Sequence, residues 1–284
     1  MSQPGVSRSL SPFDLQHRTR TVLLDAIDAL SEHRAAVIVI GAQAVYLHTG
    51  SLDIALPEMT KDSDVAINPV VLKDDPRLEA AMEAAGFVPN VNQQPGAWIS
   101  ADGIPVDLMV PELLAGPGGK QSRSARIPPH AKRAARRARG LEAALVDHAV
   151  ISVPGFVEGD TRVLVANVAG PAALVVAKCH KIAERVQHPS RLNDKDAHDI
   201  YRLLAACDTG LLADAFGGLL ADDLSRAVTI EAVGHLQELF VVSSGALGAV
   251  MAGRAEEGFG EPEQVSAAVR FLAGDLLAAI SDLV

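Results

Sequence analysis

Two aspartates one residue apart, Asp62 and Asp64, are the residues of this sequence best suited to chemistry. They lead into Val65 and Ile67. On a strand the side chains alternate faces, so both carboxylates would project the same way, roughly 7 Å apart along the backbone. Such a pair repels unless water solvates it or a divalent cation lies between the acids. An acidic turn before a strand is the alternative, and the surrounding sequence favours the cation.

A predicted strand, a glycine and a predicted helix precede the acid pair. Residues 35–40 form a β-branched run typical of a buried strand, and residues 42–48 predict a short helix. The N–H groups at the start of a helix favour an anion such as a phosphate. Gly41 would let the backbone approach that phosphate closely, so Gly41 and Ala42 are candidate nucleotide-binding residues.

A third acid follows in a predicted hairpin. Residues 97–100 and 104–110 flank a turn containing Asp102 and Gly103, and the second arm carries Asp107. We expect Asp62, Asp64 and Asp107 on neighbouring strands, where they could hold Mg²⁺ against a nucleoside triphosphate. Asp107 is either a third metal ligand or the base for the attacking hydroxyl, and the metal would offset charge on the leaving pyrophosphate.

Two predicted helices in the second half carry opposite charges at helical spacing. Lys178, Lys181 and Arg185 share one face of the first helix, and Asp196 and Asp199 share a face of the next. These faces form either an interhelical ion-pair network or solvated stripes, or they bind phosphates.

The elements that must position these residues fall into two halves. We predict an α/β (α+β) fold: an N-terminal mixed sheet with helices in residues 12–168, followed by a C-terminal helical bundle in residues 169–284. We expect residues 1–11 to be disordered. Helices are predicted at 14–31, 76–85, 172–187, 195–207, 210–220, 226–250 and 262–283, and further strands at 63–67, 149–153 and 162–168.

Charge and composition restrict the function. The net charge of −10 excludes a uniformly basic nucleic-acid binder, but residues 120–139 hold eight Lys/Arg and no acid. Such a block is either a solvated, flexible segment or an electrostatic arm. Two cysteines without a CxxC motif indicate a reducing compartment. We predict a cytoplasmic protein, because no signal peptide is evident and the longest apolar run, residues 35–47, is shorter than the ~20 residues of a membrane span.

The glycine and acid motifs together resemble the nucleotidyltransferase superfamily of the polymerase-β type. Its pattern is a strand, Gly-Ser or Gly-Gly, a helix, an acid-x-acid strand and a third acid on a later strand. Here these are Gly41-Ala42, Asp62-Ser-Asp64 and Asp107. Ala42 departs from the pattern, because the hydroxyl of a serine is missing.

The charged helices resemble motifs of the AbiEii abortive-infection toxins and their mycobacterial relatives, the MenT toxins. The resemblance implies Mg²⁺-dependent transfer of a nucleotide from an NTP to the 3′ end of tRNA by a toxin with a cognate antitoxin. It implies that Lys178 or Lys181 pairs with the phosphates and that Arg185 stabilises developing charge. Asp196 would orient the lysine or contact the nucleotide, with Asp199 as the following acid.

These motifs suggest where a tRNA acceptor would bind, and they leave three alternative functions open. If the acceptor is tRNA, the basic segment 120–139 is the candidate contact with its backbone. A small-molecule nucleotidyltransferase of the antibiotic-modifying type would use the same metal site, and deleting 120–139 should spare it. An HD-type phosphohydrolase would need His198 and Asp199 with His180 or His188 as metal ligands. A non-enzymatic regulator would show no Mg²⁺-dependent NTP binding.

Overall fold

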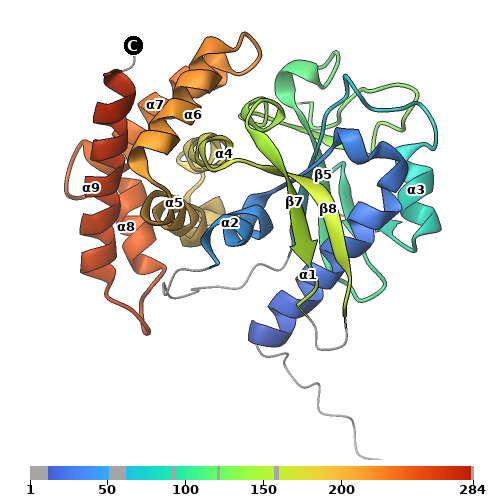
Figure 1. Ribbon diagram of the computed structural model, residues 1–284, viewed down its shortest axis with the longest axis horizontal. Helices are drawn as coiled ribbons and strands as arrows, with labels where there is room; N and C mark the ends of the chain where they lie inside the picture. Colours follow the sequence, from blue (N-terminus) through green and yellow to red (C-terminus); the bar gives the residue numbers. More distant parts are fainter. Residues whose placement is uncertain (1–11, 51–61, 91–93, 120–121, 157–159, 283–284) are drawn as a thin grey trace, which may run out of the picture.

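The structure is a computed structural model that describes residues 12–50, 62–90, 94–119, 122–156 and 160–282. The predicted disorder of residues 1–11 lies outside the described residues, as does Lys120 of the basic segment. A mixed sheet with helices against it occupies one side of the molecule, and a group of helices occupies the other (Figure 1). The predicted fold class is confirmed.

The sheet has eight strands in the order β3-β4-β5-β2-β1-β8-β7, with β6 pairing with β5. β1 runs parallel to β8, and β2 runs parallel to β5, whereas β1 and β2 are antiparallel. The strands are β1 (Val37–Ile40), β2 (Ser63–Ile67), β3 (Val88–Pro89), β4 (Ala97–Ile99), β5 (Pro105–Pro111), β6 (Arg136–Ala138), β7 (His148–Pro154) and β8 (Val163–Ala169).

The local sequence explains the central strands well. β2 covers the predicted residues because buried Val65, Ala66 and Ile67 lie between β1 and β5. The predicted hairpin is present as β4 and β5, which pair in antiparallel fashion. β1 begins two residues later than predicted, because Ser31–Ala36 form a 3₁₀-helix. The helices of this half are α1 (Pro12–Ala29), α2 (Gly41–Thr49) and α3 (Leu78–Ala84).

Among the described residues after Gly170, all regular secondary structure is helical. The helices are α4 (Pro171–Arg185), α5 (Asp194–Ala206), α6 (Thr209–Ala221), α7 (Arg226–Leu236), α8 (Leu247–Arg254) and α9 (Pro262–Ser281). The prediction of one helix over 226–250 is wrong. α7 passes into a π-helical turn, Gln237–Val241, and Ser243, Ser244 and Gly245 separate it from α8, because these residues favour turns over helix. The division into two domains near residue 168 stays a prediction.

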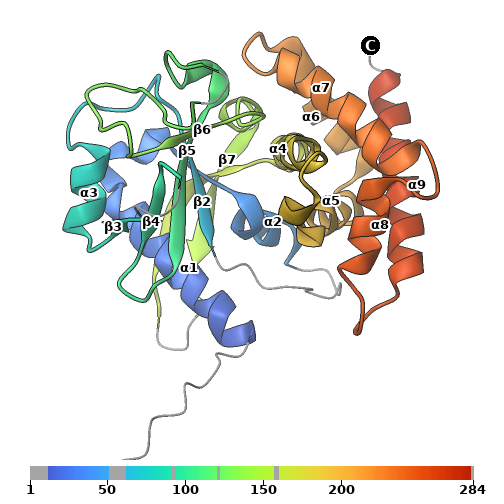
Figure 2. The ribbon, with the colours of Figure 1, turned by 180° about the vertical axis from the view of Figure 1, so that it is seen from behind.

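Helix α2 connects the two halves of the molecule by its contacts. α2 contacts β1 and β2 as well as α4 and α5, so it lies between the sheet and the other helices (Figure 2). Among the described helices, α9 has the length and hydropathy of a membrane span, and 28% of its apolar window is buried. Its buried residues recur on one face, as in a helix of a bundle: Val265, Val269, Ala273, Leu276 and Ile280.

Candidate active site

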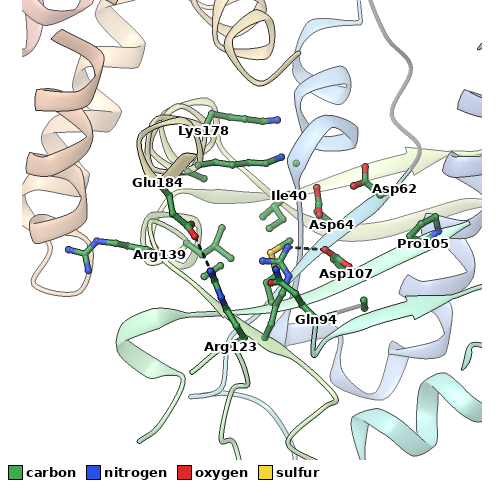
Figure 3. Close-up of a pocket in the computed structure, with 18 of the residues that line it drawn as sticks. Ile40, Asp62, Asp64, Gln94, Pro105, Asp107, Arg123, Arg139, Lys178 and Glu184 are labelled. Atoms are coloured by element: carbon green, nitrogen blue, oxygen red, sulfur yellow. Dashed lines mark hydrogen bonds and ion pairs between the residues drawn. The ribbon is translucent and has the colours of Figure 1, made fainter. Parts of the chain in front are cut away.

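The sheet brings two of the three predicted acids side by side. Asp64 of β2 pairs in register with Ile40 of β1 on one side and with Asp107 of β5 on the other. Asp62 lies one residue before β2, is exposed, and approaches the same pocket. Figure 3 shows the three carboxylates on the sheet side of this pocket.

Gly41 is required at the start of α2 by its backbone and by its neighbour. Its φ of +67° is a conformation that glycine adopts without the cost that a Cβ brings. A Cβ at this position would lie 2.2 Å from Oδ2 of Asp64. From the sequence we expected Gly41 to let a phosphate approach the backbone, and its missing Cβ also makes room for the Asp64 carboxylate. Ala42 is buried and does not line the pocket.

The electrostatics of Asp64 suit a cation. Burial and, to a lesser extent, the neighbouring Asp62 and Asp107 raise its pKa from 3.8 to about 6, against the opposing effect of Lys181 and Arg136. A divalent ion would reverse this imbalance by stabilising the ionised form. The ligand oxygens of Asp62, Asp64 and Asp107 do not all lie within 4.8 Å of one another, so an ion would draw them together.

Asp107 is held by an arginine that the motif search did not identify. Nη2 of Arg136 donates a hydrogen bond of 2.8 Å to Oδ2 of Asp107. Arg136 begins β6, which pairs with the C-terminal part of β5. This ion pair orients the carboxylate toward the pocket and makes Asp107 a weaker candidate for a metal ligand than Asp64.

The opposite wall of the pocket is built by α4, and α5 packs behind it. Each helix has an acid or amide side chain at its start: Oδ2 of Asp147 accepts from the Ala173 N–H, and Oδ1 of Asn193 accepts from the Lys195 N–H. These caps fix where the helices begin, and therefore where their charged faces lie. The two helices contact each other and α2.

Of the alternatives that the sequence left open for these two charged faces, the ion-pair network between the helices is present. Nζ of Lys178 donates a hydrogen bond to Asp196 Oδ1 and another to Asp199 Oδ2, and each bond is 2.7 Å long. Lys181 Nζ is 2.9 Å from Oδ1 of Asp196, and Arg185 Nη1 is 3.4 Å from its Oδ2. One buried carboxylate therefore receives three cationic side chains.

The network settles the charge of its members. Burial alone would lower the pKa of Lys178, but Asp196 and Asp199 outweigh it and hold that pKa above its usual value. Burial would raise the pKa of Asp196, but Lys178 and Lys181 hold it well below its usual range. Lys178 and Asp196 are therefore both charged near neutral pH. Neither Asp196 nor Asp199 lines the pocket; they support it from behind Lys178 and Lys181.

A cavity of about 390 Å³ separates the two walls. Gly41 and the three acids line one side, and Lys178, with other cationic side chains, lies opposite (Figure 3). Arg139 and six further Lys or Arg residues line the cavity, whereas only four acids do. This surplus of positive charge contrasts with the net charge of −10 of the whole protein. A cavity with surplus positive charge and a cluster of acids fits an anion bound together with a metal ion. The cationic side chains are Arg123, Arg136, Lys178, Lys181, Arg185 and Arg191.

The described part of the basic segment is neither a flexible nor a detached arm, which corrects one expectation from the sequence. Its residues 122–139 fold against β5, and Ala125, Ala134 and Ala135 are buried. Arg137 donates to the carbonyl oxygens of residues 115, 116 and 124. Arg123, Arg136 and Arg139 line the pocket. Deleting 120–139 would therefore remove part of the site under either acceptor.

The sequence placed Arg123, Arg136 and Arg139 only in a basic segment expected to contact the tRNA backbone, with Arg133, Arg136 and Arg137 as its named candidates, and gave no sign that any of them lines the pocket. Their short-range pattern indicated only a basic segment, because the pairing of β6 with β5 that brings them to the pocket is a tertiary contact. Charge density was the available signal, and it pointed to the right segment without identifying the residues.

His198 and Asp199 do not form the metal site that the HD-type alternative requires. His198 Nε2 lies 2.8 Å from Oε1 of Glu256, and His180 Nε2 lies 2.8 Å from the carbonyl oxygen of Val228. Asp199 is occupied by Lys178. Among the described residues, neither His198 nor Asp199 belongs to a group of three or more potential ligands close enough to share an ion.

Comparison with known proteins identifies the family. A family model described as nucleotidyltransferase matches residues 18–221, which include both walls of the pocket. The chain belongs to this nucleotidyltransferase family. A search of the curated proteins finds no match. One solved structure, a crystal structure from H. pylori that is provisionally described as a nucleotidyltransferase, is 11% identical and covers 97% of this chain and 99% of its own. Its TM-score of 0.34 is too low to support any inference.

Proposed function

We propose that this nucleotidyltransferase transfers a nucleotide from an NTP, with Mg²⁺ bound by Asp62 and Asp64, to the 3′ end of a tRNA. The observation that carries the proposal is the opposition of two walls across one cavity. Paired acids on β2 and β5 face cationic side chains from α4, with Gly41 at the start of a helix between them. Carboxylate oxygens suit Mg²⁺, and lysines suit phosphates.

The metal would bridge the acids and the triphosphate. Asp64 is the central ligand because it lies between β1 and β5 and beside Gly41. Mg²⁺ would stabilise the ionised carboxylate and offset charge on the leaving pyrophosphate. Asp107, oriented by Arg136, is the base for the acceptor hydroxyl or a further ligand.

The two lysines have different surroundings, which supports different roles. The side chain of Lys178 is only 7% exposed and bridges two carboxylates, whereas that of Lys181 is 39% exposed and contacts Asp196 alone. Lys181 is also the cation that lowers the pKa of Asp64 most. Lys181 would therefore contact the phosphates, while Lys178 would hold α4 and α5 together.

The assignment of a toxin with tRNA as acceptor rests on the resemblance to the AbiEii and MenT toxins. Supporting it, the motifs at Lys178–Arg185 and Asp196–Asp199 form one connected ion network behind the pocket. A toxin of this kind would need an antitoxin, and induced expression would arrest growth. Asp64→Asn should abolish both arrest and transfer.

The test of the activity uses each labelled NTP with total tRNA and Mg²⁺, comparing wild type with Asp64→Asn. One labelled NTP should transfer more label to tRNA than the other three. Sequencing of RNA 3′ ends after induced expression should show the added nucleotides. Transfer that persists in Asp64→Asn would contradict the metal assignment.

A small-molecule acceptor is the alternative, and exposed residues of the basic segment distinguish it. Arg126 and Lys132 are exposed and do not line the pocket. Reversing both charges should weaken tRNA modification and its salt dependence while sparing NTP binding. Unchanged tRNA modification in this variant would show that the segment does not contact the tRNA, whereas wild-type protein that labels a small molecule and no tRNA would favour the small-molecule acceptor.

A further inference from the structure

Helix α7 packs against α4 (Figure 2). Three potential metal ligands lie close together between these two helices. One ligand atom from each of His180, Glu231 and His235 lies within 4.8 Å of the others. In the described part of the chain no other group of three or more His, Cys, Asp or Glu residues has this geometry. We infer that this cluster is a second metal site, which binds Zn²⁺ or a similar transition-metal ion.

The tautomer of His180 presents a lone pair to the cluster. Its Nε2 lies 2.8 Å from the carbonyl oxygen of Val228, and because a carbonyl only accepts, Nε2 carries the proton. Nδ1 is then unprotonated, and it lies 4.0 Å from Oε2 of Glu231. Histidines that bind metals commonly donate their other N–H to a carbonyl in this way, which fixes the ring.

The ring of His180 is also held from its other side. A Cβ at Gly140 would lie 2.6 Å from Cδ2 of His180, so the backbone at Gly140 packs directly against the imidazole. His180 is therefore a buried ligand whose position is set before an ion arrives. A preset first ligand reduces the ordering that binding requires.

The other two ligands come from one face of α7. Glu231 and His235 are four residues apart, so they lie one above the other on the helix. The rings of His180 and His235 are 5.4 Å apart at an interplanar angle of 88°. Burial lowers the pKa of His180, and hydrogen bonds from Arg139 lower the pKa of Glu231. A neutral imidazole and an ionised carboxylate are the forms that bind metals.

The ligand set differs from that of the Mg²⁺ site. Two imidazole nitrogens and one carboxylate suit Zn²⁺, with water as a fourth ligand, whereas Mg²⁺ prefers oxygen ligands alone. Tetrahedral ligands about 2.1 Å from Zn²⁺ lie roughly 3.4 Å apart, so the cluster must contract on binding. Glu231 is 42% exposed and His235 is half-buried, which gives both room to move toward His180.

Arg139 connects this site to the pocket. Its Nε and Nη2 bond the Glu231 carboxylate at 2.6–3.0 Å, so the guanidinium competes with the ion for this ligand. Arg139 also lines the pocket, with its guanidinium turned away from the acids (Figure 3). Removing the guanidinium should therefore tighten metal binding.

The test is calorimetric titration of the metal-free full chain with Zn²⁺ in excess Mg²⁺, which occupies the oxygen-ligand site. We expect one Zn²⁺ per chain, bound at least tenfold more weakly by His235→Gln. His188→Gln, which changes an exposed histidine outside the cluster, and Asp64→Asn should bind Zn²⁺ as wild type does. Arg139→Met should bind it more tightly.

Each contrary result overturns the inference. Zn²⁺ binding that survives in His235→Gln but disappears in Asp64→Asn would put the ion in the active site. The absence of saturable binding would remove the site. Arg139→Met keeps the test meaningful if His235→Gln fails to fold, because binding no tighter than that of wild type would contradict the competition on which the site depends. These outcomes do not depend on nucleotide transfer.

Discussion

The two walls of the pocket treat their acids in opposite ways. On the sheet side burial and neighbouring acids raise the pKa of Asp64 to about 6. On the helix side Asp196 is buried but receives Lys178, Lys181 and Arg185, and the two lysines hold its pKa well below its usual range. The helix wall is thus complete within the protein, whereas the sheet wall has too little positive charge. The difference indicates that α4 and α5 supply support and phosphate contacts, and that the sheet needs a metal ion.

The largest effect should come from breaking the helix wall. Lys178→Met leaves Asp196 and Asp199 buried without their shared partner, and we expect a loss of about 3–5 kcal/mol in the free energy of unfolding. Lys181→Met, at a more exposed position, should cost under about 1 kcal/mol. Urea unfolding of both variants measures the difference, and equal losses would refute the division of roles between the lysines.

In the sheet wall, replacing the acid Asp64 should increase the free energy of unfolding, by an amount that depends on pH. In metal-free protein the folded-state pKa of Asp64 is raised, so the proton stabilises the fold, and this contribution is lost as the pH rises from about 4 through 6. Asp64→Asn has no such loss. It should be more stable than wild type by up to about 3 kcal/mol at pH 7.5, with the advantage shrinking toward pH 4. Unfolding with a chelator at several pH values measures this, and an advantage that does not depend on pH would contradict it.

Substitution of Gly41 tests whether the space beside Asp64 matters. Gly41→Ala should cost about 1–2 kcal/mol for its positive φ, and should also weaken Mg²⁺-dependent NTP binding because the Cβ displaces the carboxylate. Gly103→Ala is the matched control, since Gly103 also has a positive φ but nothing within 4 Å of the added Cβ. Loss of Mg²⁺ dependence in both variants would mean that backbone strain alone is responsible.

The smallest effect should be that of Lys181 on the nucleotide. Lys181→Met is expected to weaken NTP binding about tenfold, or about 1.4 kcal/mol, because one phosphate contact is lost. The exposed Lys132, outside the pocket, provides the control, and Lys132→Met should bind NTP as wild type does. Calorimetry with a non-hydrolysable analogue measures both.

The sequence predicted the elements whose burial pattern is local. β2, the β4–β5 hairpin and the helices that carry Lys178 and Asp199 follow from alternation, a turn signal and helical periodicity. The sequence did not predict that residues 122–139 fold onto β5, because few apolar residues mark that pairing. The break between α7 and α8 was missed because apolar spacing continues across it.

The central claim is that Asp64 holds the metal through which the triphosphate binds. It is tested most directly by measuring the affinity of a non-hydrolysable NTP with and without Mg²⁺, in wild type and in Asp64→Asn. We predict that Mg²⁺ tightens binding at least tenfold in wild type and has no effect in Asp64→Asn. An equal enhancement by Mg²⁺ in both proteins would contradict the claim.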